Sequence, residues 1–202
     1  SPEFYKISKY FHSKGIKLIA IQLAGRNYIN GKKIHVLFIP NYFTIGQAEQ
    51  YYYRKNLKNL LNIQTIGSIQ AASAKKYLDN INSKHNEKFD ICLISEPHVD
   101  KGEYWGISGV EKKIGLIAEY TLKFCKKHNK KLVFSGKADL NSPYKEAEII
   151  FYKNNIKNFN FNIKFDSKEK FGSYKNIQNS HIVIGGFSTM LREAFLFKKK
   201  IL

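Results

Sequence analysis

Short, continuously apolar segments alternate with longer helical patterns along this chain. Five segments have the length and the β-branched or aromatic content of buried strands: 17–22, 35–39, 90–94, 131–134 and 181–184. Their apolarity is continuous, which is typical of strands covered on both faces, as in parallel sheets. Helical patterns lie between them, over residues 47–59, 71–83, 110–128, 142–154 and 188–197. The alternation predicts an α/β fold built from βαβ units, with a parallel sheet and flanking helices.

The clearest helical pattern covers residues 110–128. Its apolar and small side chains recur at three- and four-residue steps and form one stripe: Ile114, Ile117, Ala118, Thr121, Leu122 and Cys125. Residues 126–128, Lys-Lys-His, complement the negative end of the helix dipole. A strand-like segment at 63–66 runs into a Gly-Ser turn, where we expect a boundary between two parts of the chain. Residues 154–162 are Asn-rich and predict a loop.

Both ends of the sequence indicate a piece of a longer protein. Residues 1–4, Ser-Pro-Glu-Phe, have the character of a cloning remnant, so we expect Tyr5 to be the first native residue. At the other end, Lys198 to Leu202 resembles the opening of a strand. We therefore expect native sequence on both sides.

The chain is strongly basic, with 34 Lys plus Arg against 16 Asp plus Glu and a formal net charge of +18. Such a charge attracts phosphates, anionic glycans, anionic lipid or nucleic acid. Only Arg26, Arg54 and Arg192 are arginines, and because bidentate reading of bases favours Arg, specific nucleic-acid binding is not expected. A solvated basic surface with no specific partner is the alternative.

The cysteine content and the hydropathy profile indicate the compartment. Cys92 and Cys125 are too few for a disulfide framework and favour a reduced compartment. No apolar run has the length needed to span a bilayer, and the start lacks the profile of a secretion signal. We therefore expect a cytoplasmic protein. Residues 47–54 are rich in tyrosine next to cations, which allows peripheral contact with an anionic membrane or, alternatively, packing of a tyrosine face on the core.

The richest chemical pattern follows the last predicted strand, which ends in Gly185 and Gly186 before a helix that begins after Ser188 and Thr189. The glycines permit close backbone approach, free amides at a helix start attract anions, and two hydroxyls add donors. Glu193, one turn further, would accept hydrogen bonds from ribose hydroxyls. The alternative is that Ser188 only caps the helix and that Glu193 is solvated or pairs with neighbours of Arg192. Neither G-x-G-x-x-G nor a Walker lysine is present.

Residues 171–194 resemble bacterial surface-carbohydrate glycosyltransferases built from two Rossmann domains, the GT-B class. In that pattern a Tyr-led helix precedes a strand, and a Ser-Thr turn and a Glu-Ala helix follow, as at Ser188-Thr189 and Glu193-Ala194. Further similarity to the end of such an enzyme's first domain and its linker lies at residues 19–22, 39–42, 45–46 and 65–68. The resemblance implies an incomplete N-terminal Rossmann-like domain with its linker at 5–68, and a C-terminal nucleotide-sugar-binding domain at 69–202.

The resemblance also implies roles for individual residues. Gly185, Gly186, Ser188 and Thr189 would bind the donor phosphate, and Glu193 the donor ribose. Gly67 and Ser68, at the linker, would also contact the donor. Two positions depart from the family pattern: Leu23-Ala24-Gly25 stands where many relatives have His-Gly after the Gln, and Ser135 to Asp139 replaces a His-Pro turn. Lys137 would then supply the phosphate cation in place of the missing histidine.

Glu96 and His98 are the candidate catalytic residues. They follow the predicted strand 90–94, at the edge where open α/β sheets place their ligands. Glu96 would act as a general base or hold a sugar hydroxyl, with His98 beside it. The alternative is that both are ordinary loop residues. The His and Cys spacings predict no metal site, and no cofactor is expected beyond the nucleotide-sugar substrate.

The function expected from these observations is transfer of a sugar from a nucleotide-sugar donor to a surface glycan or glycolipid acceptor, although the fragment alone need not turn over. Two alternatives stay open. One is a non-enzymatic basic module that binds an anionic polymer or membrane. The other is a nucleotide-sugar epimerase, which shares the two-domain layout.

Overall fold

The structure is a computed structural model of the chain. It describes residues 2–22, 41–56, 62–81, 87–97, 110–157, 159–166 and 170–202. The chain divides into two compact units, residues 1–72 and 73–202, which are described separately. The boundary falls inside a helix, α3 (Ile69–Asn80), four residues after the boundary expected from the sequence.

The smaller unit contains a three-stranded parallel sheet of order β1-β2-β3. Its elements are α1 (Pro2–Ser13), β1 (Ile19–Ile21), β2 (Asn41–Thr44), α2 (Gln47–Asn56) and β3 (Asn62–Thr65). Tyr53 of α2 packs edge-on against Tyr42 of β2, with ring centroids 4.9 Å apart, so one tyrosine of the segment 47–54 belongs to the core. The predicted strand at 35–39 lies outside the described residues.

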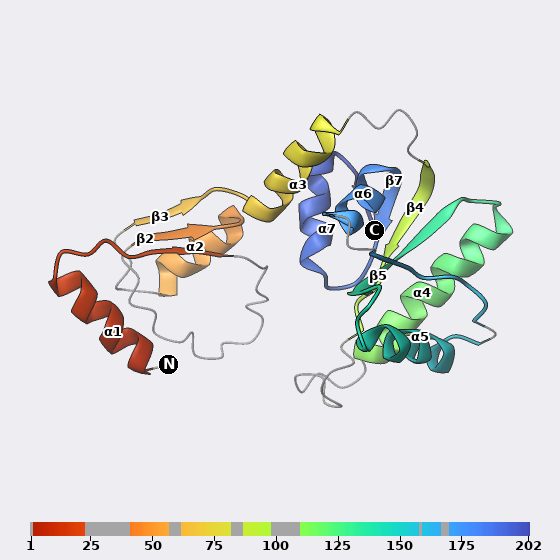
Figure 1. Ribbon diagram of the computed structural model, residues 1–202, viewed down its shortest axis with the longest axis horizontal. Coiled ribbons are helices and arrows are strands. Elements are labelled where there is room, and N and C mark those ends of the chain that lie inside the picture. The colour runs from red at the N-terminus through yellow and green to blue at the C-terminus, as the bar shows by residue number, and fades with distance from the viewer. Residues whose placement is uncertain are drawn as a thin grey trace. The chain divides into compact units, whose positions relative to one another are not determined.

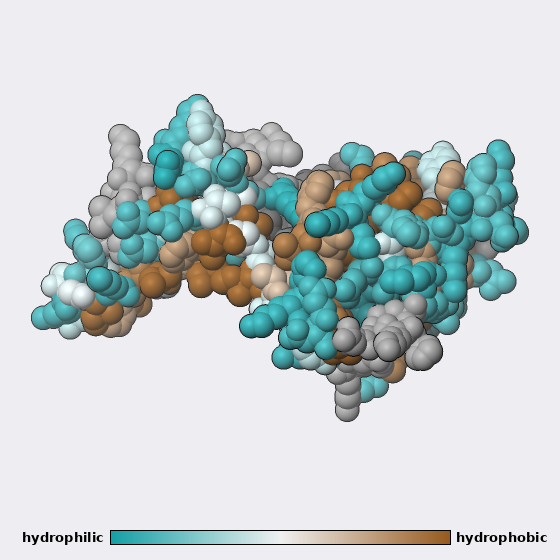
Figure 2. All heavy atoms as spheres, turned by 90° about the horizontal axis from the view of Figure 1, so that it is seen from above, coloured by the Kyte–Doolittle hydropathy of each residue, from teal (hydrophilic) through white to brown (hydrophobic). Residues whose placement is uncertain are grey.

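The surface of the smaller unit is partly hydrophobic (Figure 2). Exposed isoleucines among its described residues are Ile7, Ile16, Ile19, Ile21, Ile66 and Ile69. β1 therefore leaves both of its isoleucines accessible to solvent, which is unusual for a strand of a parallel sheet.

The larger unit contains a five-stranded parallel sheet of order β6-β5-β4-β7-β8. After α3 its elements are β4 (Phe89–Ile94), α4 (Val110–Lys127), β5 (Leu132–Asp139), α5 (Tyr144–Asn155), β6 (Lys164–Asp166), α6 (Gly172–Gln178), β7 (Ser180–Ile184), α7 (Thr189–Glu193), the 3-10 helix η1 (Ala194–Phe197) and β8 (Lys200–Ile201). Numbered within this unit, the strands run 3-2-1-4-5, the order of a Rossmann fold. The protein is thus an α/β protein with parallel, Rossmann-like topology.

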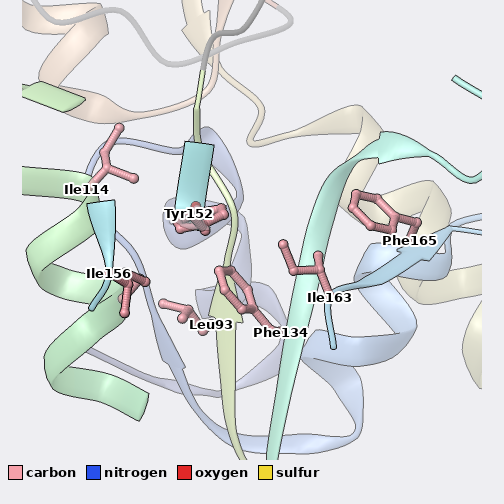
Figure 3. Packing of buried hydrophobic residues seen from close by; sticks show 8 residues of the cluster. Leu93, Ile114, Phe134, Tyr152, Ile156, Ile163 and Phe165 are labelled. Atoms are coloured by element: carbon pink, nitrogen blue, oxygen red, sulfur yellow. The ribbon is translucent and has the colours of Figure 1, made fainter. Parts of the chain in front are cut away.

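Helices lie on both faces of this sheet (Figure 1). α4 and α5 cover one face, and α6 lies on the other, where Tyr77 of α3 meets the ring of Phe171 at 5.6 Å. Between the sheet and α4–α5, the side chains of Leu93, Phe134 and Tyr152 form the centre of the core (Figure 3). The rings of Phe134 and Tyr152 lie edge to face at 4.7 Å.

Most of the predicted elements of this unit are confirmed. The stripe of the helix at 110–128 faces the core, with Ile114, Ala118, Thr121 and Cys125 buried. The strand opening expected near the carboxyl end is β8. β6 and β2 were not predicted, because each is short and carries polar residues in place of a continuous apolar run: Lys-Phe-Asp in β6 and Asn-Tyr-Phe-Thr in β2. α1, of which only the first three residues lie in the excluded segment 1–4, was not predicted either.

Candidate ligand pocket at the switch point of the larger sheet

The strand order reverses between β4 and β7. From β4 the chain moves to β5 and β6 on one side, and it then returns to β7 on the other side of β4. The segments that leave the carboxyl ends of β4 and β7 lead to α4 and α7, so a crevice is expected between them. In open α/β sheets this position holds the ligand. Glu96, two residues after β4, and the turn at 185–188 after β7 lie at this point.

Glu96 fills the amide nest of that turn. The backbone N–H of Gly186 donates to both carboxylate oxygens at 3.0 and 3.1 Å, and that of Phe187 does so at 3.0 and 2.9 Å. The N–H of Ser188 donates to Oε1 at 2.8 Å. The Glu96 side chain is buried, at 7% exposure for the residue. Hydrogen bonds from several N–H groups to one carboxylate are of the strong, charge-assisted kind.

This geometry corrects the expectation that the amides after the glycine pair are open to a phosphate. They are taken by a carboxylate from a strand end about ninety residues earlier in the chain. The sequence pattern could not indicate this contact, because it depends on β4 and β7 being neighbours in the sheet. The phosphate role of Gly185 and Gly186 stays a prediction.

The glycine pair makes room for the carboxylate. A Cβ atom on Gly185 would lie 2.9 Å from Glu96 Oε1, and one on Gly186 would lie 3.1 Å from Oε2. Both distances are shorter than ordinary contacts between a methyl group and an oxygen. The close backbone approach predicted for these glycines is therefore present, with a side-chain carboxylate as the group that approaches.

Ser188 has a local role at the start of α7. Its extended backbone (φ −65°, ψ 138°) and its Oγ, which accepts the N–H of Met190 at 3.3 Å, make it the N-cap. Thr189 is the first residue of α7 and is half-buried. The helix has five residues before it tightens into η1, so it presents a short dipole.

Glu193 points away from this turn. It is buried, and its Oε2 accepts the hydroxyl of Tyr174 on α6 at 2.7 Å. Burial and the neighbouring carboxylate raise the pKa of Tyr174 above its ordinary value. Glu193 is not among the described residues that line the pocket at the switch point. Glu193 is thus paired with Tyr174 of α6, a partner that the sequence did not indicate, and its ribose role stays a prediction.

A second buried carboxylate, Glu148 on α5, was missed by sequence reasoning. It accepts the backbone N–H groups of Lys137 and Ala138, each at 2.9 Å, and the hydroxyl of Ser95. The hydroxyl of Tyr152 lies 3.1 Å from Ser95 Oγ, and burial raises the pKa of Tyr152. A signal was available, because Glu148 and Tyr152 are four residues apart on the face of the predicted helix that carries apolar residues.

A pocket of about 190 Å³ lies between these two carboxylate clusters. It is lined by Ile94, Ser95, Glu96, Ser135, Gly136, Lys137, Ser173, Phe187, Ser188 and Met190. Four hydroxyls, one carboxylate and one ammonium group therefore surround it, a lining suited to a ligand with several hydroxyls. Pockets for drug-sized ligands measure roughly 300–1,000 Å³, so this one holds a group the size of one sugar ring or phosphate.

Lys137 and the serines are oriented by their neighbours. Lys137 Nζ donates to the carbonyl oxygen of Pro97 at 3.2 Å, which links β5 to the segment after β4. Asn176 of α6 donates to Ser135 Oγ at 3.1 Å. The lining is thus held by hydrogen bonds from α5, α6 and the segment after β4.

The other predicted site residues lie elsewhere. His98 lies outside the described residues, and its proposed place beside Glu96 stays a prediction. Gly67 and Ser68 belong to the smaller unit. Gly67 has a φ of +79°, and Ser68 caps α3 by accepting the N–H of Ala71 at 3.1 Å. Any role of these two in ligand binding stays a prediction.

Within the described ranges, no group of three or more His, Cys, Asp or Glu residues could hold a metal ion. Both cysteines are buried and free, and burial raises the pKa of Cys92 to about 12, so this thiol is inert. Among the helices of these ranges, none has the length and apolarity to cross a membrane.

Comparison of the sequence with known proteins assigns the chain to no family. No protein-family model matches this chain, and no curated protein matches it.

Proposed function

We propose that residues 73–202 are the donor-binding part of a GT-B glycosyltransferase, which transfers a sugar from a nucleotide-sugar to a glycan or glycolipid acceptor. The observation that carries this proposal is the polar pocket at the switch point of a parallel sheet with Rossmann strand order. Its hydroxyls and single carboxylate match a sugar, and Lys137 matches a phosphate next to it. The resemblance of residues 171–194 to such enzymes agrees with this position.

The pocket is proposed to take the sugar-phosphate portion of the donor. Glu96 and the hydroxyls of Ser135 and Ser173 would accept or donate hydrogen bonds to the sugar. Lys137 would leave the Pro97 carbonyl and pair with the phosphate. Because three amides already hold Glu96, we assign it a binding and orienting role in preference to that of the general base.

The proposed reaction is displacement at the anomeric carbon of the sugar. The bond from this carbon to the phosphate oxygen breaks, and its electron pair leaves with the nucleotide. The acceptor hydroxyl forms the new bond and gives its proton to a base. Lys137 and the hydroxyl of Ser188 would stabilise the negative charge that develops on the phosphate. Reduced, buried cysteines agree with a cytoplasmic location, where we propose that the protein acts.

The experiment is calorimetric titration of the chain with CMP, UDP, GDP and their sugar conjugates. We expect one base to be preferred and its sugar conjugate to bind more tightly than the free nucleotide. Lys137→Ala should weaken binding at least tenfold, since it removes a charge-assisted contact worth about 1.5–3 kcal/mol. Lys153→Ala, at an exposed position of α5, is the matched control. Absence of binding by every nucleotide and conjugate would overturn the proposal.

A further inference from the structure

The outward face of α4 carries apolar side chains that the core does not use. Leu116, Tyr120 and Phe124 are 39%, 67% and 48% exposed. They are four residues apart, so they form one row along the helix. The opposite side of the same helix supplies Ile114 and Ala118 to the core. α4 thus has a second apolar face that folding of this unit does not require.

Lysines surround this row. The sequence of α4 contains five lysines and two glutamates, and the lysines, all exposed, are Lys112, Lys113, Lys123, Lys126 and Lys127. At 100° per residue, Lys113, Lys123 and Lys127 lie within about 60° of Leu116 around the helix. The ammonium of Lys123 lies 6.0 Å from the ring centroid of Tyr120 and also pairs with Glu119 at 2.7 Å, so the net positive charge beside the row comes from Lys113 and Lys127. Cations and aromatic rings therefore share one surface, which we call the α4 stripe: residues 113, 116, 120, 123, 124 and 127.

We propose that the α4 stripe rests on an anionic membrane surface. Tyr120 and Phe124 enter the interface at the level of the headgroups, and the lysines contact the lipid phosphates. Their long aliphatic stems allow the ammonium groups to reach the phosphates while the rings are buried. Each lysine near an anionic surface strengthens binding roughly fivefold, and the net charge of +18 acts in the same direction.

The composition of the stripe favours lipid over a protein partner. The cores of protein interfaces are enriched in aromatic residues and Arg but depleted in Lys. α4 contains lysines and no arginine. An interdigitated pattern of Lys and aromatic residues is instead typical of helices that lie in a membrane interface. The proposal concerns a surface outside the pocket, so it does not depend on donor binding.

The experiment is co-sedimentation of the whole chain with vesicles. One set contains phosphatidylcholine alone, and in the other about a third of the lipid is phosphatidylglycerol. We expect binding to the anionic vesicles only, weakening as salt is added. The variant Tyr120→Ser/Phe124→Ser should bind these vesicles at least about tenfold more weakly, because it removes two apolar groups from the interface. Phe195→Ser, at a residue of η1 that is 69% exposed, should bind like the wild type.

Two charge variants distinguish vesicle binding by the α4 stripe from vesicle binding through the net charge of the whole chain. Lys113→Glu/Lys127→Glu changes two lysines of the stripe, and Lys76→Glu/Lys200→Glu changes two exposed lysines outside it. Both alter the net charge equally, and we expect the first to lose at least tenfold more binding. Any one of three results overturns the proposal. These are wild-type protein that stays in the supernatant with anionic vesicles, equal losses of vesicle binding in the two pairs of charge variants, and self-association in solution that requires Tyr120 and Phe124. Circular dichroism confirms folding of each variant, and nucleotide titration of the same variants tests the pocket separately.

Discussion

Glu96 and Glu148 make the same kind of contact at two neighbouring strand ends. Each buried carboxylate accepts backbone N–H groups from another segment: those of residues 186–188 for Glu96, and those of Lys137 and Ala138 for Glu148. They differ in their surroundings. Glu148 also binds Ser95 and is 2% exposed, whereas Glu96 borders the pocket. Glu148 therefore belongs to the interior of the fold, whereas Glu96 lies at a pocket where we propose that a ligand binds.

Glu148→Ala tests the structural side of this comparison and should have the largest effect. It leaves the partly buried N–H groups of Lys137 and Ala138 without their acceptor and removes one of the two partners of the Ser95 hydroxyl, at about 1–3 kcal/mol for each unsatisfied group. We expect the free energy of unfolding to fall by about 3 kcal/mol or more, measured by denaturant titration. Glu146→Ala, at an exposed position of the same helix, should change it by less than about 0.5 kcal/mol. Equal effects of the two substitutions would contradict the role given to Glu148.

Glu96→Gln tests the other side of the comparison, the position of Glu96 at the pocket. A glutamine retains one acceptor oxygen but turns an NH2 group toward the N–H of Phe187 or Gly186, which costs about 1–3 kcal/mol of stability. Since Glu96 lines the pocket, we also expect weaker binding of the preferred nucleotide-sugar. Denaturant titration and calorimetry measure the two effects. A variant that binds the donor as tightly as the wild type would remove Glu96 from the binding site.

Alkaline pH should destabilise the larger unit through its buried tyrosines. The pKa values of Tyr152 and Tyr174 are raised in the folded state from an ordinary value of 10.0, by burial in the first place. The contribution of these tyrosines to the free energy of unfolding is complete below pH 10. It declines above pH 10, because the unfolded chain then loses protons that the folded chain keeps. For Tyr152 the slope is about 1.4 kcal/mol per pH unit. Unfolding measured between about pH 9 and pH 11 should show a shallower decline in Tyr152→Phe.

Ser188→Ala should have the smallest effect. It removes the cap of a five-residue helix, worth about 1 kcal/mol, and leaves the Glu96 contact to the Ser188 N–H in place. We therefore expect a small loss of thermal stability and a loss of donor binding smaller than that of Lys137→Ala, because a neutral hydroxyl contributes less to a phosphate contact than an ammonium group does. A loss of binding as large as that of Lys137→Ala would contradict this ranking.

The sequence predicted elements better than contacts between them. The strands at 90–94 and 181–184 and the helix at 110–128 follow from apolar runs and periodicity, which are local properties. The pairing of β4 with β7 is not local, and the contact of Glu96 with residues 186–188 depends on it. Glu148 was missed for a different reason: its burial depends on the contact of α5 with the end of β5, although its place one turn before Tyr152 on the same helix face was a local signal.

Because Gly186 has no side chain, the Glu96 carboxylate can approach its backbone. The residue types allowed at positions 96 and 186 therefore depend on each other, although the two positions are far apart in the sequence. A methyl group at residue 186 would lie 3.1 Å from the Glu96 carboxylate, so a larger residue there requires the carboxylate to shift and is better accommodated when residue 96 is shorter, as with Asp or Ser. Related chains, when compared, should therefore exchange residues 96 and 186 together. A library that varies both positions at once should recover folded proteins that single substitutions at residue 186 do not.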